Sequence, residues 1–386
     1  MRALFIALTV GAFVLASAEC LAQTPPDYDF TWATITHPGN PAFPGDPNPP
    51  PDRPQELAIG RGSVSYEYRI ADTELSVAQW TEFVNTFAVQ ADFPTHLFGV
   101  TAFTRSTPLD IVTDGSYSGP GRRYTYLPSR ANNGLFNGVR WRDAALYCNW
   151  LHNGKSSDPA SLWGGAYDTS TWDSDGAPHT DAPTHEPSAR FWIPTQDEWM
   201  KAAFWDPANP NLDGWWRYLN ASDEPPVPGR PGEPGATSNA GLEIVPGFNP
   251  RLVPLGAYPD ALSPWGLLDT ASGNREWLEE DLYDEHYSRG AHGTGAGWGV
   301  EQAHVAAIGG APVISHSYNF RLASAVPSPG TGTVILILWL FEGGARRRNH
   351  DGLSIHARSV DSVHCCKPNK RRAATSGGEG VQLVGR

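Results

Sequence analysis

Alternating apolar and polar positions predict two short strands near the start of the chain. Residues 30–35 read FTWATI and residues 64–70 read VSYEYRI, and alternation with a period of two is typical of a half-buried strand. We expect these strands to pair. The segment between them, residues 38–54, contains eight prolines, which cannot donate to a sheet ladder. It is therefore expected to be an exposed Pro-rich loop.

Three later segments have the periodicity of amphipathic helices. Ser76 is suited to cap a helix whose apolar residues fall at positions 77, 80, 84 and 87. A second helix is predicted over about 142–152, where Cys148 lies on an apolar stripe and is expected in the core. The third begins at Thr195, which forms a capping box with Glu198. Long stretches rich in Gly, Pro, Asp and Asn separate these elements, and no repeat or boundary interrupts residues 26–324. The pattern predicts a single α+β domain.

Composition supports a folded, loop-rich protein and excludes some classes of partner. The 386 residues include 40 Gly and 35 Pro, but also 15 Trp, 15 Phe and 13 Tyr, which supply enough apolar surface for a core. The net charge is −13, so nucleic acid is not expected as a partner, since phosphate binding depends on clustered Lys and Arg. The four cysteines, at positions 20, 148, 365 and 366, do not form a disulfide framework.

Residues 1–22 have the features of a secretory signal peptide. Met1 and Arg2 precede an apolar run over residues 4–16, and small-residue cleavage motifs end at Ala18 and Ala22. The run is shorter than the ~20 residues that span a bilayer. We expect an exported protein that resides in the periplasm, at the cell surface or outside the cell.

A second apolar run, residues 334–341 (VILILWLF), lies near the other end. Alone it fits a buried strand. Prolines at 327 and 329 precede it and arginines at 346–348 follow it, an order that resembles the PEP-CTERM sorting signals of exported bacterial proteins. The resemblance implies a sorting segment at residues 325–348 with transient membrane association. The basic tail, residues 349–386, has no helix or strand periodicity and is expected to be disordered.

Six blocks of the chain follow one another in a recognisable order. They are residues 68–76 (YRIADTELS), 139–151 (VRWRDAALYCNWL), 193–199 (IPTQDEW), 253–259 (VPLGAYP), 266–277 (GLLDTASGNREW) and 319–323 (NFRLA). Asn239 falls in register between the third and fourth blocks. Together these blocks resemble the domain of formylglycine-generating enzymes, which are also called sulfatase-modifying factors. The resemblance implies a compact domain with a C-type-lectin-like core and much irregular structure.

The same resemblance bears on catalysis. The family oxidises a cysteine of a client sulfatase to formylglycine, with O2 and a copper ion held by two enzyme cysteines. In residues 295–305, GAGWGVEQAHV, those positions fall at about Val300 and Val305, and residues 149–364 contain no cysteine. Cu(I) selects thiolate ligands, so bound copper is not expected. The iron-dependent branch of the superfamily uses three histidines in a separate helical domain, which this chain lacks.

The resemblance also implies a structural calcium ion beside residues 266–277. Asp269 and Glu276 would supply carboxylates, while Ser272 and Asn274 would supply main-chain carbonyls, and Ca²⁺ prefers such hard oxygen ligands. Asn239 matches a residue of a second calcium site. In the alternative interpretation the segment is a turn in which Asp269 and Glu276 form salt bridges.

Two hypotheses of function follow. In the first, the protein is a non-catalytic family member that binds an unknown ligand or partner, a glycan or a peptide, at the bacterial envelope. In the second, it is an oxidase or related metal-dependent enzyme with a rebuilt active site. His292 or His304 would then be the residue that indicates metal chemistry. A pocket shared by Trp298, His292 and His304 would favour the second. Three-histidine metal binding by His292, His304 and His316 is not expected, because a spacing of twelve matches no ligand geometry.

Overall fold

The computed structural model describes residues 25–51, 54–91, 93, 111–136, 138–173, 178–282, 286–316 and 318–327. All of them belong to one unit of the chain, which ends at Ser328. The signal peptide predicted at residues 1–22 and the tail at 349–386 lie outside the described residues, and so does the sorting segment after residue 327. Within the described part, no helix is both long and apolar enough to cross a membrane.

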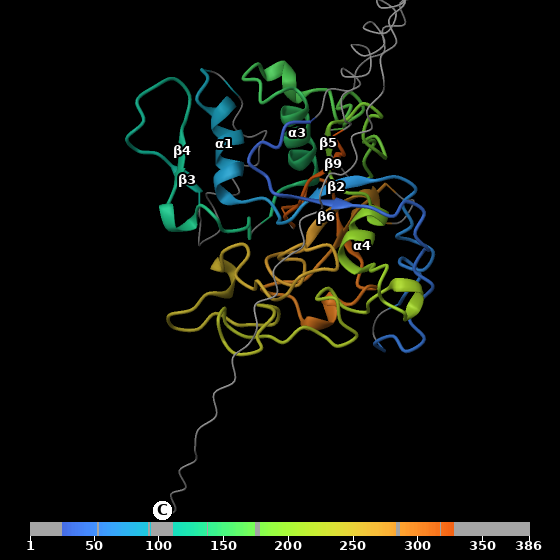
Figure 1. Ribbon diagram of the computed structural model, residues 1–386. Coiled ribbons are helices and arrows are strands. Elements are labelled where there is room, and N and C mark those ends of the chain that lie inside the picture. The colour runs from blue at the N-terminus through green and yellow to red at the C-terminus, as the bar shows by residue number, and fades with distance from the viewer. Residues whose placement is uncertain are drawn as a thin grey trace, which may run out of the picture. The chain divides into compact units, whose positions relative to one another are not determined.

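Four short strands from distant parts of the chain form the central sheet (Figure 1). In spatial order they are β1 (Trp32–Ile35), β2 (Tyr68–Ala71), β9 (Ala323–Ala325) and β5 (Phe191–Trp192), and neighbours are antiparallel. Ala33 pairs with Ile70, so the predicted pairing of the first two strands is confirmed. The sheet brings the two ends of the domain together, because β2 and β9 lie about 250 residues apart in the sequence.

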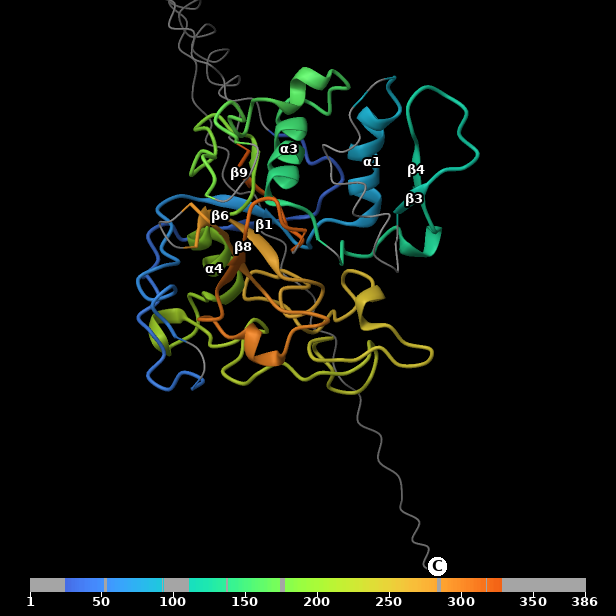
Figure 2. The same ribbon diagram turned by 180° about the vertical axis from the view of Figure 1, so that it is seen from behind.

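In the described residues three α-helices pack around this sheet, and all three were predicted. They are α1 (Val77–Ala88), α3 (Trp141–His152) and α4 (Gln196–Phe204). The hydroxyls of Ser76 and Thr195 accept hydrogen bonds from the first turns of α1 and α4, and both helices begin with complete capping boxes. In both views α3 and α4 lie on opposite sides of β2, and α1 lies between α3 and the β3–β4 hairpin (Figures 1 and 2).

Within the described ranges there are also two smaller sheets. β3 (Ile111–Thr113) and β4 (Tyr124–Tyr126) form a hairpin, while β6 (Glu276–Asp281), β7 (Arg289–His292) and β8 (Gly309–Ala311) form an antiparallel sheet. The other residues that the structure describes are irregular apart from short 3₁₀ turns. These are η2 (Pro128–Arg130), η3 (Pro159–Leu162), η4 (Leu212–Gly214), η5 (Pro250–Leu252) and η6 (Val300–Ala303).

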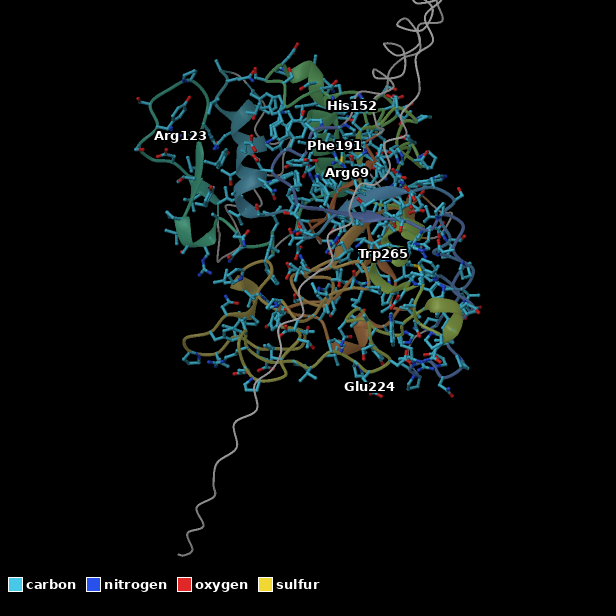
Figure 3. All side chains as sticks on the ribbon, viewed as in Figure 1. Arg69, Arg123, His152, Phe191, Glu224 and Trp265 are labelled. Carbon is cyan, nitrogen blue, oxygen red and sulfur yellow. The ribbon has the colours of Figure 1, made fainter. Side chains whose placement is uncertain are left out.

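Aromatic side chains dominate the core between α1 and α3. Trp80 and Phe83 of α1 pack on Tyr147 of α3, with ring centroids 6.0 and 5.2 Å from it. Cys148 is fully buried beside them, as its position on the apolar stripe predicted, and burial raises the pKa of its thiol well above the usual value. Figure 3 shows Arg69 and Phe191 within the central sheet region and Arg123 out on the β3–β4 hairpin.

The Pro-rich loop forms no strand in its described residues, as predicted, but it is not simply exposed. Asn40, Phe43 and Asp46 are all buried. The Phe43 ring lies 5.7 Å from the ring of Trp215, and the Asn40 amide donates to the carbonyl of Gly62. Prolines prevent sheet pairing without preventing side chains from docking, so the prediction of an exposed loop was wrong for these three residues.

Candidate functional site

The predicted calcium segment joins a buried ion pair. Arg321, just before β9, donates through Nε and Nη2 to the Glu276 carboxylate at 2.5 and 2.6 Å, and both side chains are fully buried. Trp199 of α4 donates its indole N–H to the same carboxylate at 2.9 Å. Glu276 therefore makes the salt bridge of the alternative interpretation. Asp269 instead accepts from the Gly256 amide and the Ser272 hydroxyl.

A third carboxylate, Glu74, joins Glu276 and Asp269 in the interior. Its Oε1 accepts a hydrogen bond from the main-chain N–H of Asn274 at 3.0 Å. Its other oxygen, Oε2, is buried without a hydrogen-bond partner. Burial and the charges of Glu276 and Asp269 raise the pKa of Glu74 well above its usual value. Burial also raises the pKa of Asp269 to about 6. One arginine thus faces three acidic groups, an arrangement that a bound cation would stabilise.

Glu74 borders a small cavity that also contacts two of the predicted calcium residues. Asn239 and Asn274 line it, with a volume of about 10 Å³, roughly the space that one water or one ion needs. The Asn239 amide nitrogen donates to the Pro250 carbonyl, whereas its oxygen is buried without a partner. Gly273 has a φ of 75°, and a side chain there would collide with Glu74. Two partnerless buried oxygens at one cavity fit a hard cation.

Sequence analysis missed Glu74. It lies within the block of residues 68–76 and about 200 positions before Asn274, so no local spacing could have joined it to the site. An acidic residue immediately before the predicted strand-to-helix turn was the one available signal. The structure places Ser272, Asp269, Asn274, Glu276 and Asn239 in one region, though only the two asparagines line the cavity.

The two positions aligned with the copper cysteines carry no ligand for copper. Val300 begins η6, and Val305 is fully buried in the apolar cluster around α4. Arg275 lies beside this segment, because its guanidinium donates to the Gln302 side chain at 3.3 Å and to the Ala307 carbonyl at 2.7 Å. A fixed cation and aliphatic side chains do not fit a copper site, which needs thiolates.

Trp298, His292 and His304 do not share a pocket. The His292 ring stacks on Trp199 at 4.7 Å, and its two nitrogens contact the Val305 carbonyl and the Gly293 amide. Burial lowers the pKa of His292 to about 3. His304 instead contacts the Asp46 carboxylate and the Ala306 amide. Both rings are therefore occupied by neighbouring groups and do not converge on a common ligand position.

Trp298 and His316 contact groups other than those around His292 and His304. The Trp298 ring stacks against the Arg275 guanidinium, 5.2 Å from its centroid, and also packs near Tyr318. His316 is partly buried, and burial lowers its pKa. These contacts of His292, His304 and His316 are thus made with different neighbouring groups.

An open polar pocket of about 380 Å³ lies where the Pro-rich loop meets the segment after η4. Asp46 and Asp223 face Arg217 at 3.0 and 3.5 Å, and Tyr218 supplies an aromatic face. One oxygen of Asp223 is buried without a hydrogen-bond partner. Charged groups, an aromatic ring and a partnerless acceptor together suit a small polar ligand. Sequence analysis did not identify this pocket, because its two sides lie about 170 residues apart.

A comparison with protein families gives one match over most of the folded region. Residues 55–327 match the family described as "Sulfatase-modifying factor enzyme 1-like domain". The chain belongs to this family. The matched region begins after β1, yet β1 pairs with β2 inside it, so the fold extends beyond the family match at its N-terminal end. The mixed α/β architecture agrees with the predicted C-type-lectin-like fold of the family.

Solved structures similar to this family member include three at low identity. The "Crystal Structure of CarF" has 16% identity and a TM-score of 0.45, and the match covers 78% of this chain and 99% of that one. "Treponema denticola variable protein 1" has 13% identity, a TM-score of 0.36 and coverages of 77% and 95%. "Structure of PvdO from Pseudomonas aeruginosa" has 13% identity and a TM-score of 0.35, and the match covers 75% of this chain and 100% of that one. A search of curated proteins finds no match.

Proposed function

We propose that this family member is an exported, non-catalytic protein that binds a ligand or partner at the bacterial envelope. The observation that carries the non-catalytic part is the side-chain chemistry at the copper positions. Val300 and Val305 offer only methyl groups, and Arg275 places a positive charge against the same segment. Cys148 is no substitute, because its buried thiol has a raised pKa and belongs to the α1–α3 core.

The polar pocket beside the Pro-rich loop supports the binding part of the proposal. Its carboxylates and the Arg217 guanidinium offer acceptors and donors for the hydroxyls of a glycan or the amides of a peptide, and the Tyr218 ring offers a stacking surface. A volume of about 380 Å³ lies in the range of small-molecule sites, roughly 300–1,000 Å³. Asp46 is itself buried and forms an ion pair with Arg217. This pair holds the two sides of the pocket together.

The catalytic question is tested on the purified protein without its signal peptide. Cu(I) is offered in competition with a colorimetric chelator, and a cysteine-containing sulfatase peptide is incubated with protein, copper and air. We expect the chelator to keep the copper and the peptide to keep its thiol mass. The double variant Val300→Cys with Val305→Cys is the positive control for copper binding. Conversion of the peptide cysteine to an aldehyde by the wild type would support the alternative, an oxidase with a rebuilt active site.

The binding question is tested by thermal shift with defined probes. Glucose, N-acetylglucosamine and a set of tripeptides are each added at millimolar concentration, and at least one class should raise the melting temperature. Tyr218→Ala and Asp223→Asn should remove that shift. Ile244→Ala, an exposed residue at a separate surface pocket, is the matched control and should retain it. A shift that survives both pocket variants, or no shift with any probe, would contradict this site.

A structural calcium ion is part of the proposal. Glu74 and Asn239 would supply the two partnerless oxygens at the small cavity, and Asp269, Ser272 and Asn274 lie next to it. Calcium supplies positive charge and no redox chemistry, so its role there would be to neutralise buried carboxylates and to hold residues 266–277 against Glu74. The Glu276 carboxylate is already matched by Arg321, so it would act from outside the ligand shell.

A further inference from the structure

The β6–β7 hairpin places an acidic residue and a histidine at its tip. Asp281 ends β6 and pairs with Arg289, which begins β7. The turn closes with the Leu282 amide donating to the Ser288 carbonyl at 2.7 Å. His286 lies in this turn, and its side chain is 57% exposed. Its Nδ1 lies 2.8 Å from Oδ2 of Asp281, so carboxylate and imidazole meet on one side of the hairpin.

A separate segment brings a second histidine to the same carboxylate. The His179 amide donates to the His286 carbonyl at 2.6 Å, which fixes the segment against the hairpin turn. Arg289 holds the following residues, because its guanidinium donates to the carbonyls of Pro183 at 3.2 Å and Ala182 at 2.8 Å. The His179 side chain is fully buried, and its Nε2 lies 2.9 Å from Oδ1 of Asp281.

These contacts leave ring nitrogens available. The two ring nitrogens of the buried His179 make no hydrogen bond, and neither does Oδ1 of Asp281. Nε2 of His179 lies close to this oxygen, but the two atoms are not aligned for a hydrogen bond. A buried polar atom without a partner costs roughly 1–3 kcal/mol. The separation of Nε2 and Oδ1 also suits two ligand atoms of one metal ion, each about 2 Å from it.

We propose that His179, Asp281 and His286 form a site for a first-row divalent metal ion, with Zn²⁺ as its representative. One ligand atom from each residue lies within 4.8 Å of the other two, and small adjustments of the exposed His286 would bring all three to bonding distance. Two imidazoles and one carboxylate are the ligand set of zinc and of non-haem Fe(II) sites, and they are unsuited to Ca²⁺.

Three side chains surround the Asp281 carboxylate. Besides the two histidines, Nε of Arg289 lies 3.3 Å from Oδ1 of Asp281, and neither of these two atoms makes a hydrogen bond. The Arg289 guanidinium donates instead to main-chain carbonyls, so it does not occupy the ring nitrogens of the two histidines. Because His286 is exposed, the fourth side of the site faces solvent. A water or a ligand group could complete the coordination there, as in open metal sites.

The test uses the purified, chelator-stripped protein and metal alone. Zn²⁺ is titrated against a chromophoric chelator, and Co²⁺ is added separately to record its visible absorption. We expect one tight Zn²⁺ per chain and a Co²⁺ spectrum typical of four-coordinate nitrogen and oxygen ligands. His286→Gln and Asp281→Asn should each weaken Zn²⁺ binding by tenfold or more, whereas the exposed His37→Gln should bind like the wild type.

Circular dichroism of each variant serves as the control that the variant is folded. His286 is exposed, so its replacement should leave the fold intact even if replacement of the buried His179 does not. Glu74→Gln should leave Zn²⁺ binding unchanged, which separates this site from the calcium cavity. Zn²⁺ affinity that is equal in the wild type, His286→Gln and Asp281→Asn would overturn the proposal, as would binding no tighter than millimolar. In that case the cluster is a hydrogen-bonded ion-pair network.

Discussion

Both oxygens of the Glu276 carboxylate accept hydrogen bonds from the Arg321 guanidinium, although Glu276 begins β6 and Arg321 lies 45 residues later, just before β9. The pair therefore ties the three-stranded sheet to the central sheet. Arg321 also donates to the carbonyls of Ala71 and Asp72, at the end of β2. A single buried cation thus joins three separate parts of the domain.

Arg321→Ala should be strongly destabilising. Removal of the guanidinium leaves Glu276 buried and uncompensated near Asp269 and Glu74, and breaking such a pair costs about 3–5 kcal/mol. Urea denaturation followed by tryptophan fluorescence measures the loss. Arg123→Ala breaks an ion pair on the β3–β4 hairpin (Figure 3) and should leave the midpoint unchanged. Equal shifts of the urea midpoint in the two variants would show that burial of the Arg321–Glu276 pair adds nothing to stability.

Calcium should raise the melting temperature of the chelator-treated protein, since a ligand at 100 times its Kd stabilises the native state by about 2.7 kcal/mol. Glu74→Gln should abolish that shift. In the absence of calcium the same variant should melt higher than the wild type, because it removes the cost of burying an ionisable carboxyl group beside Glu276 and Asp269. Scanning calorimetry with and without EGTA measures both effects.

The exposed Glu82→Gln is the control for the calcium measurement. Glu82 pairs with Lys155 on the surface, so its neutralisation should leave the calcium shift intact. If Glu74→Gln or Asn239→Ala retained the full shift in a folded protein, calcium would bind elsewhere.

His292 should make the protein sensitive to acid. Its folded pKa of about 3 lies below the ordinary histidine value of 6.5, so between these values the unfolded chain binds a proton that the native state does not. Stability from this residue is therefore complete above pH 6.5 and is lost as the pH falls toward 3. His292→Gln, which retains a donor and an acceptor, should lose less stability between pH 6.5 and pH 4 than the wild type. His37→Gln is the control, and an identical pH slope in all three proteins would contradict the prediction.

The two capping boxes should contribute measurably to stability. Ser76→Ala removes the acceptor at the start of α1 and should cost about 1 kcal/mol, and Thr195→Ala should have a similar effect at the start of α4. Chemical denaturation measures both. Ser170→Ala, an exposed serine in an irregular segment, should change the midpoint by no more than experimental error. An Ser76→Ala midpoint equal to that of Ser170→Ala would show that the cap is energetically neutral.

Local hydrogen bonds explain what the sequence alone determined. The starts of α1 and α4 depend on a hydroxyl and on a side chain three residues later, so residues 76–79 and 195–198 contain the whole signal. The apolar stripe of α3 buries Cys148 for an equally local reason, and the pairing of β1 with β2 follows from alternation in two neighbouring segments. The ordered blocks were sufficient to identify the family and its fold.

Tertiary structure alone decided the sites, because their members come from irregular segments whose paths have no periodicity. Glu74 meets Asn274 across 200 positions, and Asp46 of the Pro-rich loop meets His304 across 258. His179 meets Asp281 across about 100 positions, where a main-chain hydrogen bond to His286 and the bonds from Arg289 to Ala182 and Pro183 hold its segment against the β6–β7 hairpin. Such contacts depend on how buried charges and polar atoms find partners once the core has formed, and that pairing is a property of the folded chain.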